Sequence, residues 1–290
     1  MSWRTVVITN RCKLSYKNNY LIIKNEELQM IHLSEIYCLV VDSTAVSLSS
    51  YLLSEMMKNK IKIIFCDEKR LPQGELIPYY GSHNSSKKIR NQIEWESEDK
   101  IFIWTEIIRQ KIKNQFYLLD KLSLDVGNFP NYIRDLQFAD TTNREGHAAK
   151  VYFNQLFGKD FTRNQENDIN IALNYGYSIL LAAFTKEITS LGFLTQLGFM
   201  HKNEYNSFNL SSDLMEPFRM AVDELVFLNQ DKIFDSNYKL LLIDILNNKY
   251  NFNGSNQYLT NIISIYTKSV FDAIQNNDYE ILKNFEYHEL

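Results

Sequence analysis

The sequence predicts an α+β protein in which a small β-rich N-terminal domain is followed by a larger, all-α C-terminal domain. The first 70 residues contain short β-branched and aromatic runs separated by turn-forming residues, which is typical of strands. Later segments repeat apolar residues at helical spacing. The 290 residues include only 9 glycines and 4 prolines, below the usual frequencies of about 7% and 5%, and this favours long helices with short connections.

Six short strands and one helix are expected in the N-terminal domain. Lys17, Asn18 and Asn19 separate two of the strands, and asparagine tolerates the positive φ that a tight hairpin turn requires. The strands are expected at 5–8, 14–16, 20–23, 28–32, 36–41 and 61–65, and the helix at 47–60 with Leu48, Tyr51, Leu52 and Met56 on one side. These elements predict a β-sandwich-like domain with one helix over residues 1–72.

A linker is expected between the two domains, over residues 73–90. The segment 72–86 holds two of the four prolines, two of the nine glycines and a pair of serines. The helical domain then extends over 91–290. Its helices are expected at 86–124, from Arg144 onward, and at 169–191, 212–228 and 255–276. The helix at 169–191 is apolar nearly all round, which predicts a central, buried position.

Basic side chains accompany the apolar stripe of the helix expected at 86–124. They form either a solvated helix face or a face that contacts phosphate groups. The basic residues are Lys87, Lys88, Arg90, Arg109, Lys111 and Lys113, and the stripe consists of Ile93, Ile101, Ile103, Trp104, Ile107, Ile108, Ile112, Phe116 and Leu119.

Charge and composition exclude several classes of protein. The net charge is −4, and residues 166–290 carry eight basic against sixteen acidic side chains. An acidic helical domain favours a metal ion or an electropositive partner over a bare polyanion.

Three cysteines without CxxC spacing indicate reduced thiols rather than a zinc site. No apolar run reaches the roughly 18 residues of a membrane span, and the N-terminus lacks the apolar core of a secretory signal, which predicts a cytoplasmic protein.

Glu145 is the first candidate functional residue. The helix is expected to start near Arg144, and stepping back one turn from Ala148 and Ala149 on its apolar stripe places Glu145 on the buried face. A buried carboxylate is costly unless it is paired or binds a cation. Glu145 is therefore either an N-terminal residue favoured by the helix dipole or a ligand or acid–base residue. Gly146 is unfavourable in a helix and is expected where something approaches the backbone.

Two further segments place polar groups beside apolar residues. His201 ends an apolar stretch and is either a hydrogen-bonded core residue or a ligand. Asp213 and Glu216 are three residues apart and share one helix face. Either Asp213 caps the helix while Glu216 pairs with Arg219, or the two carboxylates bind a hard divalent cation. Pro217 fits only near a helix start or at a bend.

Together these segments offer two carboxylates and an imidazole, a set that fits Mg²⁺ or Mn²⁺ with water completing the octahedron. Such an ion promotes phosphodiester chemistry by polarising the phosphoryl oxygen and stabilising the entering or leaving oxygen. The sequence contains no GxxxxGK[ST] loop, no GxGxxG fingerprint and no GxSxG elbow. Nucleotide hydrolysis, dinucleotide redox chemistry and α/β-hydrolase chemistry are therefore not expected.

Several segments of the chain resemble the CRISPR adaptation integrase family, Cas-one, in its type II-A form. The main ones read REGHAAKVYFNQLFG, GFMHKNEYNSFNLSSDLMEPFR and WRTVVITNRCKLSYKNNYLIIK, and IHLSEI, IIFCDEKRLP and FTRNQENDINIALNYGYSILL extend the likeness over nearly the whole chain. The resemblance implies an N-terminal β-domain that forms a homodimer and a C-terminal α-domain that holds a metal ion.

By motif position, the resemblance implies that Glu145, His201 and Glu216 are the catalytic metal ligands and that Asp213 is an auxiliary carboxylate beside the metal. Basic and polar side chains in or near the same motifs are candidates for contacts to DNA phosphates. These candidates are Asn143, Arg144, Lys150, Arg163 and Arg219. Affinity for DNA is then expected to fall steeply with salt concentration.

The implied reaction joins the 3′-hydroxyl ends of a captured DNA fragment, the prespacer, to the CRISPR repeat at its leader end. It is a metal-dependent transesterification, and DNA endonuclease activity is expected beside it. The implied partners are a Cas-two dimer flanked by two integrase dimers, prespacer and repeat DNA, and Csn-two with the RNA-guided effector nuclease, all in the bacterial cytoplasm and without a membrane. The alternatives are a stand-alone metal-dependent DNase that acts on branched DNA and a non-catalytic helical binding module.

Overall fold

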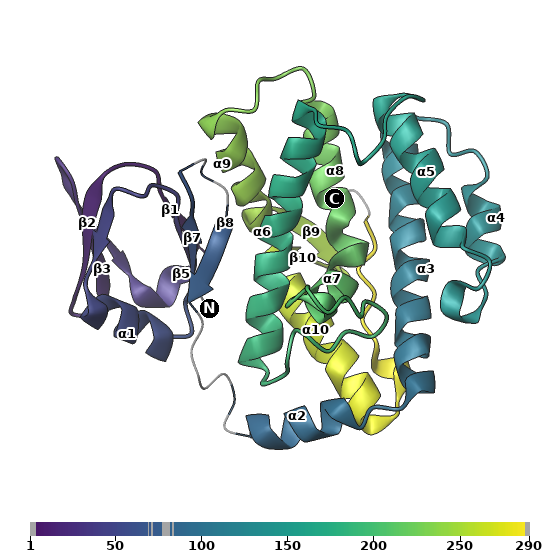
Figure 1. The fold of residues 1–290 in the computed structure, drawn as a ribbon, viewed down its shortest axis with the longest axis horizontal. Coiled ribbons are helices and arrows are strands. Elements are labelled where there is room, and N and C mark those ends of the chain that lie inside the picture. The colour runs from purple at the N-terminus through teal and green to yellow at the C-terminus, as the bar shows by residue number, and fades with distance from the viewer. Residues whose placement is uncertain (1–3, 69, 71, 77–81, 83, 288–290) are drawn as a thin grey trace. The chain divides into compact units, whose positions relative to one another are not determined.

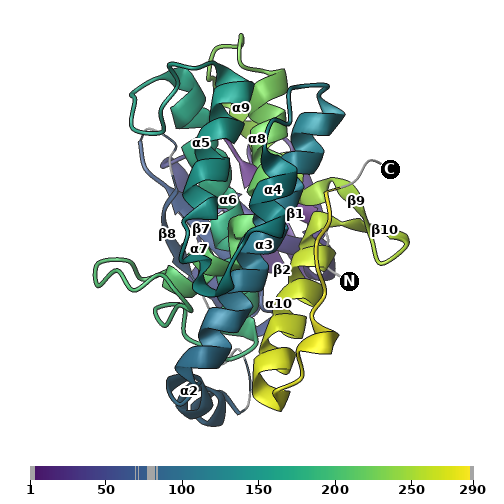
Figure 2. The ribbon, with the colours of Figure 1, turned by 90° about the vertical axis from the view of Figure 1, so that its right-hand side faces the viewer.

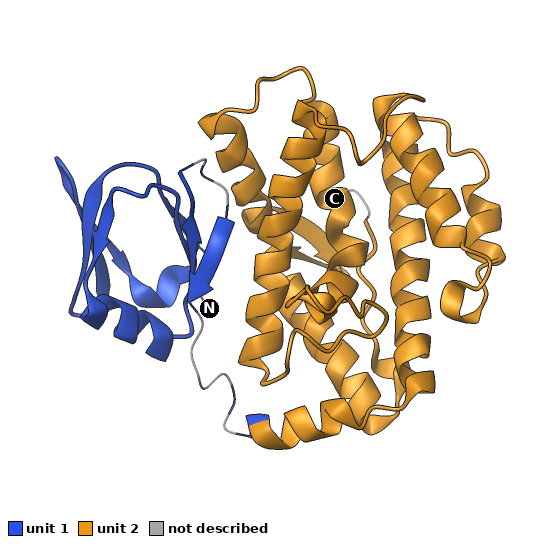
Figure 3. Cartoon of the chain, viewed as in Figure 1, with its two compact units in different colours: residues 1–85 blue, residues 86–290 orange. Residues whose placement is uncertain are grey.

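The computed structural model describes residues 4–68, 70, 72–76, 82 and 84–287. The chain forms two compact units, residues 1–85 and residues 86–290 (Figure 3). The boundary lies within the range 73–90, for which we expected a linker. Regular structure enters this range from both sides, because a strand ends at Leu76 and a helix begins at Ser85. No described helix combines the length and the apolar character that crossing a membrane requires.

The first unit contains two four-stranded sheets and one helix (Figure 1). In the first sheet β5 pairs in parallel with β1 and β7, and β8 adds an antiparallel edge. In the second sheet β3 lies between β4 and β2, and β6 pairs in parallel with β2. The elements are β1 (Arg4–Ile8), β2 (Cys12–Lys17), β3 (Tyr20–Lys24), β4 (Leu28–His32), β5 (Ile36–Val41), β6 (Val46–Leu48), α1 (Ser50–Lys58), β7 (Lys62–Cys66) and β8 (Pro72–Leu76).

The apolar pattern explains this unit. All six residues of β5 are buried, and apolar side chains from both sheets and from α1 form one core. The predicted hairpin is confirmed, because Asn18 and Asn19 take φ values of 50° and 66° between β2 and β3. The predicted helix start at 47 is wrong: Ser49 caps α1, and the preceding residues belong to β6. Tyr51, expected on one side with Leu52 and Met56, is 60% exposed, whereas the other two are fully buried.

The second unit is mostly helical, as expected. Its long helix α6 lies centrally and contacts α7, α8, α9 and α10, while α3 contacts α4, α5 and α8 (Figures 1 and 2). The α-helices are α2 (Ser85–Ile93), α3 (Ser97–Lys121), α4 (Phe129–Arg134), α5 (Arg144–Phe157), α6 (Asp168–Ser190), α7 (Asn209–Met215), α8 (Arg219–Leu228), α9 (Ser236–Asp244) and α10 (Leu259–Asn276). The 3₁₀ turns between Leu33 and Ile281 are η1 (Leu33–Glu35), η2 (Phe138–Asp140), η3 (Glu216–Phe218), η4 (Ile245–Asn247) and η5 (Tyr279–Ile281).

Three expectations for this unit are corrected. It is not all-α, because β9 (Lys249–Phe252) and β10 (Ser255–Tyr258) pair as an antiparallel hairpin, so the helix expected at 255–276 begins only at Leu259. The helix expected at 86–124 is two helices, α2 and α3, and Ile93 at the end of α2 is 64% exposed. The helix expected at 212–228 is interrupted by η3, where Pro217 removes a backbone donor.

Candidate active site

Glu145 lies in the first turn of α5, which starts at Arg144 as expected. Other residues satisfy the backbone donors of this turn. Asp140 accepts hydrogen bonds from the amides of Arg144 and Glu145 at 2.6 and 2.9 Å, and Asn143 accepts one from the amide of Gly146 at 3.3 Å. The carboxylate of Glu145 is therefore not needed as a cap, and it contacts α3 instead.

Gly146 is required by the cap of this helix. A Cβ atom at this position would lie 2.6 Å from Oδ1 and 2.8 Å from Nδ2 of Asn143. Any side chain at residue 146 would thus displace the amide that caps α5. The group that approaches the backbone here is the side-chain amide of Asn143.

Glu216 is buried at the start of η3, between α7 and α8. The backbone of η3 is held against α3, because the buried Asn114 amide donates a hydrogen bond to the carbonyl of Pro217 at 2.7 Å. Arg219 Nη2 lies 2.8 Å from Glu216 Oε1. The ion pair between Glu216 and Arg219 that the sequence suggested is therefore present. Burial alone would raise the pKa of Glu216, but Arg219 and Lys111 outweigh burial and lower it to about 2.

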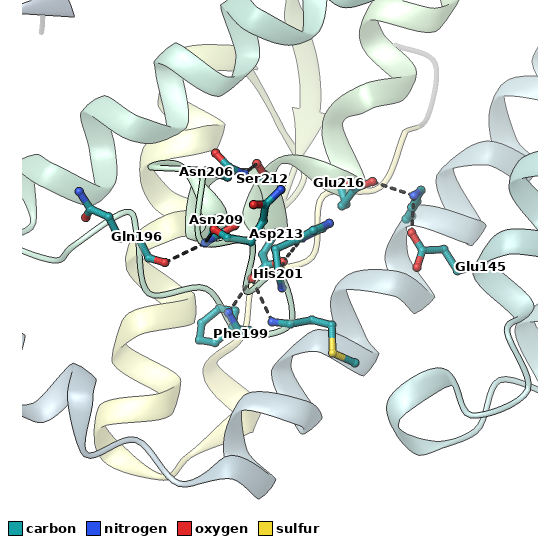
Figure 4. Close-up of polar contacts among 12 residues, drawn as sticks. Glu145, Gln196, Phe199, His201, Asn206, Asn209, Ser212, Asp213 and Glu216 are labelled. Atoms are coloured by element: carbon teal, nitrogen blue, oxygen red, sulfur yellow. Dashed lines mark hydrogen bonds and ion pairs between the residues drawn. The ribbon is translucent and has the colours of Figure 1, made fainter. Parts of the chain in front are cut away.

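Lys111 joins the two carboxylates. Its Nζ lies 2.6 Å from Glu145 Oε1 and 2.7 Å from Glu216 Oε2, and Figure 4 shows these two glutamates with their side chains directed toward each other. Burial lowers the pKa of Lys111, but the charges of the two glutamates raise it above its usual value. From the sequence, Lys111 was expected only among the basic side chains of this helix. The available signal was its position three residues after Ile108 and seven after Trp104, which places it on the buried face of α3.

Asp213 is fully buried and organises the segment that carries His201. It accepts hydrogen bonds from the backbone amides of Phe199, Met200 and His201 at 2.6, 3.2 and 3.3 Å. Its Oδ1 also contacts Nδ1 of His201 (Figure 4). The interpretation of Asp213 as a helix cap is wrong, because α7 begins four residues earlier, at Asn209.

His201 lies in an irregular segment between α6 and α7, with 44% of its side chain exposed. The interpretation as a core histidine is therefore wrong. The edge of its ring meets Trp104 at a centroid distance of 5.6 Å. Hydrogen bonding to Asp213 outweighs burial and raises the pKa of His201. With Nδ1 held by Asp213, Nε2 is the ring nitrogen that remains for a ligand, which is the usual arrangement of a carboxylate that orients a metal-binding histidine.

The residues present fit a hard divalent cation in donor type. Two carboxylates and an imidazole are ligands that Mg²⁺ and Mn²⁺ accept. Among the described residues, the partner of the buried Oε2 of Glu216 is the ammonium of Lys111, at 2.7 Å. Among the described residues, however, no three His, Cys, Asp or Glu side chains converge closely enough to hold a metal ion. The structure thus brings Glu145 and Glu216 together through Lys111 and holds His201 separately on Asp213.

Asp223 and its neighbours form a second polar cluster, which was not predicted from the sequence. Asp223 is buried on α8 and accepts hydrogen bonds from the hydroxyls of Tyr152, at 2.9 Å, and Tyr177. The guanidinium of Arg219 lies over the ring of Tyr177 at 4.5 Å, so the contacts continue from Glu216 to Asp223. Burial raises the pKa of Asp223 to about 6, although the two hydroxyls oppose this shift. Its position within an apolar run on α8 was the signal for a buried carboxylate.

The five candidate DNA contacts differ in their surroundings. Lys150 is exposed on α5, and the exposed Asn143 caps that helix. Arg144 is half-buried, and its Nε finds no hydrogen-bond partner within the described part of the chain. Arg163 donates hydrogen bonds to Asn170 and Asn174, and its guanidinium lies 5.3 Å from the ring centroid of Tyr177. Arg163 and Arg219 are thus engaged in internal contacts, whereas Lys150 presents its charge to solvent.

Comparison with known proteins identifies similar sequences and folds. Residues 5–240 match the family model described as CRISPR associated protein Cas1. The "CRISPR-associated endonuclease Cas1" of Neisseria meningitidis serogroup C (strain 8013) is 36% identical over 226 residues, which cover 77% of this chain and 74% of that protein. A "Casposase bound to integration product" has a TM-score of 0.77 at 20% identity and covers 100% of this chain and 96% of its own. A chain of a "Cas6-RT-Cas1--Cas2 complex" has a TM-score of 0.74 at 17% identity, covering 99% of this chain and 36% of its own.

Proposed function

This chain belongs to the Cas1 family of CRISPR-associated endonucleases, and we propose that it joins the 3′-hydroxyl ends of captured DNA to the leader end of a CRISPR repeat. The observation that carries this proposal is the pair of facing carboxylates, Glu145 and Glu216, beside an imidazole that Asp213 holds by Nδ1. The similar fold of a casposase bound to an integration product supports joining as the reaction.

Glu145, His201 and Glu216 would hold the Mg²⁺ or Mn²⁺ ion. When bound, the ion would polarise the scissile phosphodiester and stabilise the entering and leaving oxygens. Asp213 keeps His201 oriented with Nε2 outward, and Arg219 keeps Glu216 ionised over the whole physiological pH range. The protein side chains thus supply position and charge rather than a nucleophile.

The reaction is a transesterification in which DNA provides both the attacking and the leaving group. The prespacer 3′-oxygen forms a new bond to the phosphorus at the end of the repeat, and the bond from this phosphorus to the 3′-oxygen of the flanking nucleotide breaks. The proton lost by the attacking hydroxyl is balanced by the proton gained by the leaving oxygen. No covalent intermediate with the enzyme is required, and replacement of the DNA hydroxyl by water turns the same step into endonuclease cleavage.

We propose that the chain forms a homodimer through its N-terminal unit. Two such dimers then flank a Cas2 dimer. The substrates of this assembly are prespacer and repeat DNA. The similarity to a chain of a Cas1–Cas2 complex supports this partner. We further propose the type II-A form of the family, with Csn-two and the RNA-guided effector nuclease as additional partners in the bacterial cytoplasm.

A strand-joining assay tests this function. The protein, its Cas2 partner, a labelled duplex with 3′-hydroxyl ends and repeat DNA are mixed with Mn²⁺ or Mg²⁺, and wild type is compared with Glu145→Ala. Glu204→Ala is a matched control, because Glu204 is exposed and lies outside the candidate ligands. We expect a metal-dependent joined product with wild type and Glu204→Ala, and none with Glu145→Ala or with a blocked 3′ end.

The other outcomes separate the alternatives. Metal-dependent cutting of branched DNA without joining would favour a stand-alone DNase that uses the same site. Intact binding of Cas2 without any metal-dependent product would leave only a structural role. Circular dichroism of each variant shows whether a loss of product reflects chemistry or unfolding.

A further inference from the structure

The gap between the two candidate metal-binding carboxylates already holds a positive charge. Lys111 Nζ lies 2.6 Å from Glu145 Oε1 and 2.7 Å from Glu216 Oε2, and its side chain is 11% exposed. The lysine comes from α3, whereas the glutamates come from α5 and η3, so one ammonium lies between negative charges from two other segments. Without it, Glu145 would face a second carboxylate in a mostly dry site, which is strongly unfavourable.

A divalent ion on the same two oxygens would need the same space. Metal–oxygen distances are roughly 2.0–2.1 Å for Mg²⁺, so an ion that bridges these carboxylates would lie in the gap that the ammonium fills. Two cations cannot share this gap, because their repulsion is barely screened at a buried site.

The two contacts of Lys111 are not equivalent. The contact to Glu145 is to a carboxylate that is 28% exposed, whereas the contact to Glu216 is to a buried carboxylate that Arg219 also binds. Arg219 binds the other oxygen of Glu216 and is fixed by its stacking on Tyr177, so it is not in the way of an ion at Oε2. Lysine has a flexible stem with a compact charge, and Glu145 on its other side is 28% exposed, which gives the ammonium a direction in which to move.

We propose that Lys111 is the built-in counter-ion of the metal-free site and that a divalent ion displaces its ammonium from Glu216 when it binds. This inference rests on the proposed placement of the metal at Glu145 and Glu216. Lys111 thereby stabilises the metal-free protein and weakens metal binding, so it sets the ion concentration at which the site fills. It is a positioning residue for the carboxylates and does not act as a metal ligand.

Mn²⁺ binding to the full-length protein tests the proposal, measured by isothermal titration calorimetry and by electron paramagnetic resonance of free Mn²⁺. Lys111→Met removes the charge but keeps the length of the side chain. We expect Mn²⁺ to bind about tenfold more tightly to this variant than to wild type. We also expect the metal-free variant to melt at a lower temperature and to gain more thermal stability from Mn²⁺. Lys113→Met, two residues along the same helix and half-buried, is the matched control and should behave as wild type.

The outcomes distinguish this inference from the proposed function. If His201→Ala weakens Mn²⁺ binding while Lys111→Met leaves it unchanged or weaker, the site is where we place it and the counter-ion role is wrong. If His201→Ala binds as wild type does, or if no form binds Mn²⁺, the proposed site itself is wrong and the inference falls with it. If Lys111→Met does not fold, a crystal structure of wild type with Mn²⁺ decides. Lys111 Nζ beyond hydrogen-bond distance of Glu216 Oε2 supports the proposal, and an unmoved ammonium overturns it.

Discussion

Asp223 lies at the end of a series of contacting side chains that begins at Glu216. Arg219 binds Glu216 and stacks on Tyr177, and the hydroxyls of Tyr177 and Tyr152 both donate to Asp223. The carboxylate is almost completely buried, which disfavours its charged form and raises its pKa to about 6. The pKa values of two buried carboxylates in one cluster, Glu216 and Asp223, are thus shifted in opposite directions by their surroundings.

This shift predicts a pH dependence of stability. Because the pKa of Asp223 is higher in the folded than in the unfolded protein, its contribution is complete below the unfolded pKa near 4 and is lost as the pH rises through about 6. The asparagine side chain in Asp223→Asn does not titrate, so this variant lacks the contribution. We expect the free energy of unfolding of wild type to fall by about 2 kcal/mol relative to this variant between pH 4.5 and 7.5. Urea unfolding at several pH values measures the difference, and parallel curves for the two proteins would contradict the shift. Asp231→Asn, at an exposed position, should run parallel to wild type.

At the scale of elements, the site depends on breaks in regular structure. Glu216 stands where Pro217 interrupts the helix between α7 and α8, and His201 stands in the irregular segment before α7. The chain compensates for the lost helical hydrogen bonds with buried side chains. Asp213 accepts three backbone amides of the segment with His201, and Asn114 on α3 holds the carbonyl of Pro217. These contacts hold the segment with His201 and the η3 turn in place where regular α-helical hydrogen bonds are missing.

A substitution at Gly198 tests how tightly the segment before α7 is packed. A Cβ atom here would lie 2.5 Å from the carbonyl oxygen of His201 and 2.8 Å from Asp213 Oδ2. We therefore expect Gly198→Ala to destabilise the protein by about 1–3 kcal/mol and to weaken Mn²⁺ binding, because the methyl group must displace His201 or its carboxylate partner. Thermal melting and Mn²⁺ titration measure the two effects. Gly74→Ala, where a Cβ would meet no described residue within 4 Å, should leave Mn²⁺ binding unchanged. Wild-type metal affinity in Gly198→Ala would show that this segment does not position the ligand.

At the scale of the whole molecule, the chain separates into two units with different charge and different architecture. The two sheets and α1 form a core of their own, and all the candidate ligands belong to the helical unit. Residues 166–290 carry a net charge of −8, which is compatible with the metal ion that we propose for this unit. Binding of DNA by such a chain requires that exposed basic residues meet the phosphates locally.

The salt dependence of DNA binding measures these local contacts. We expect the affinity of the assembled protein for a short duplex to fall steeply as salt rises, by about one power of the salt concentration for each phosphate contact. Lys150→Gln should reduce the slope of log affinity against log salt by about 1 if the exposed Lys150 meets a phosphate. Lys232→Gln, on the loop after α8, should leave the slope unchanged. An affinity that does not change with salt would exclude this form of DNA recognition.

Local structure could be predicted from the amino-acid sequence wherever a periodic apolar pattern met a clear end signal. The sequence predicted the hairpin at Asn18 and Asn19, the buried strand β7, the start of α5 at Arg144 and the central helix α6. It also predicted the order of a β-rich and a helical part. These features depend on side-chain spacing and on turn chemistry within a few residues, which a single sequence contains.

Only the tertiary structure decided how the polar residues are paired. Lys111, Glu145 and Glu216 lie more than 30 residues apart in sequence at each step, and their meeting depends on how α3, α5 and η3 pack. The same is true of Asp223, whose two tyrosine partners belong to α5 and α6. A basic residue on an apolar helix face can be solvated, bound to phosphate or paired in the core. Its spacing from the apolar residues of the helix is the same in all three cases, so the spacing does not distinguish them. The free energy that selects among them comes from burial and from partners that the chain brings together only when it folds.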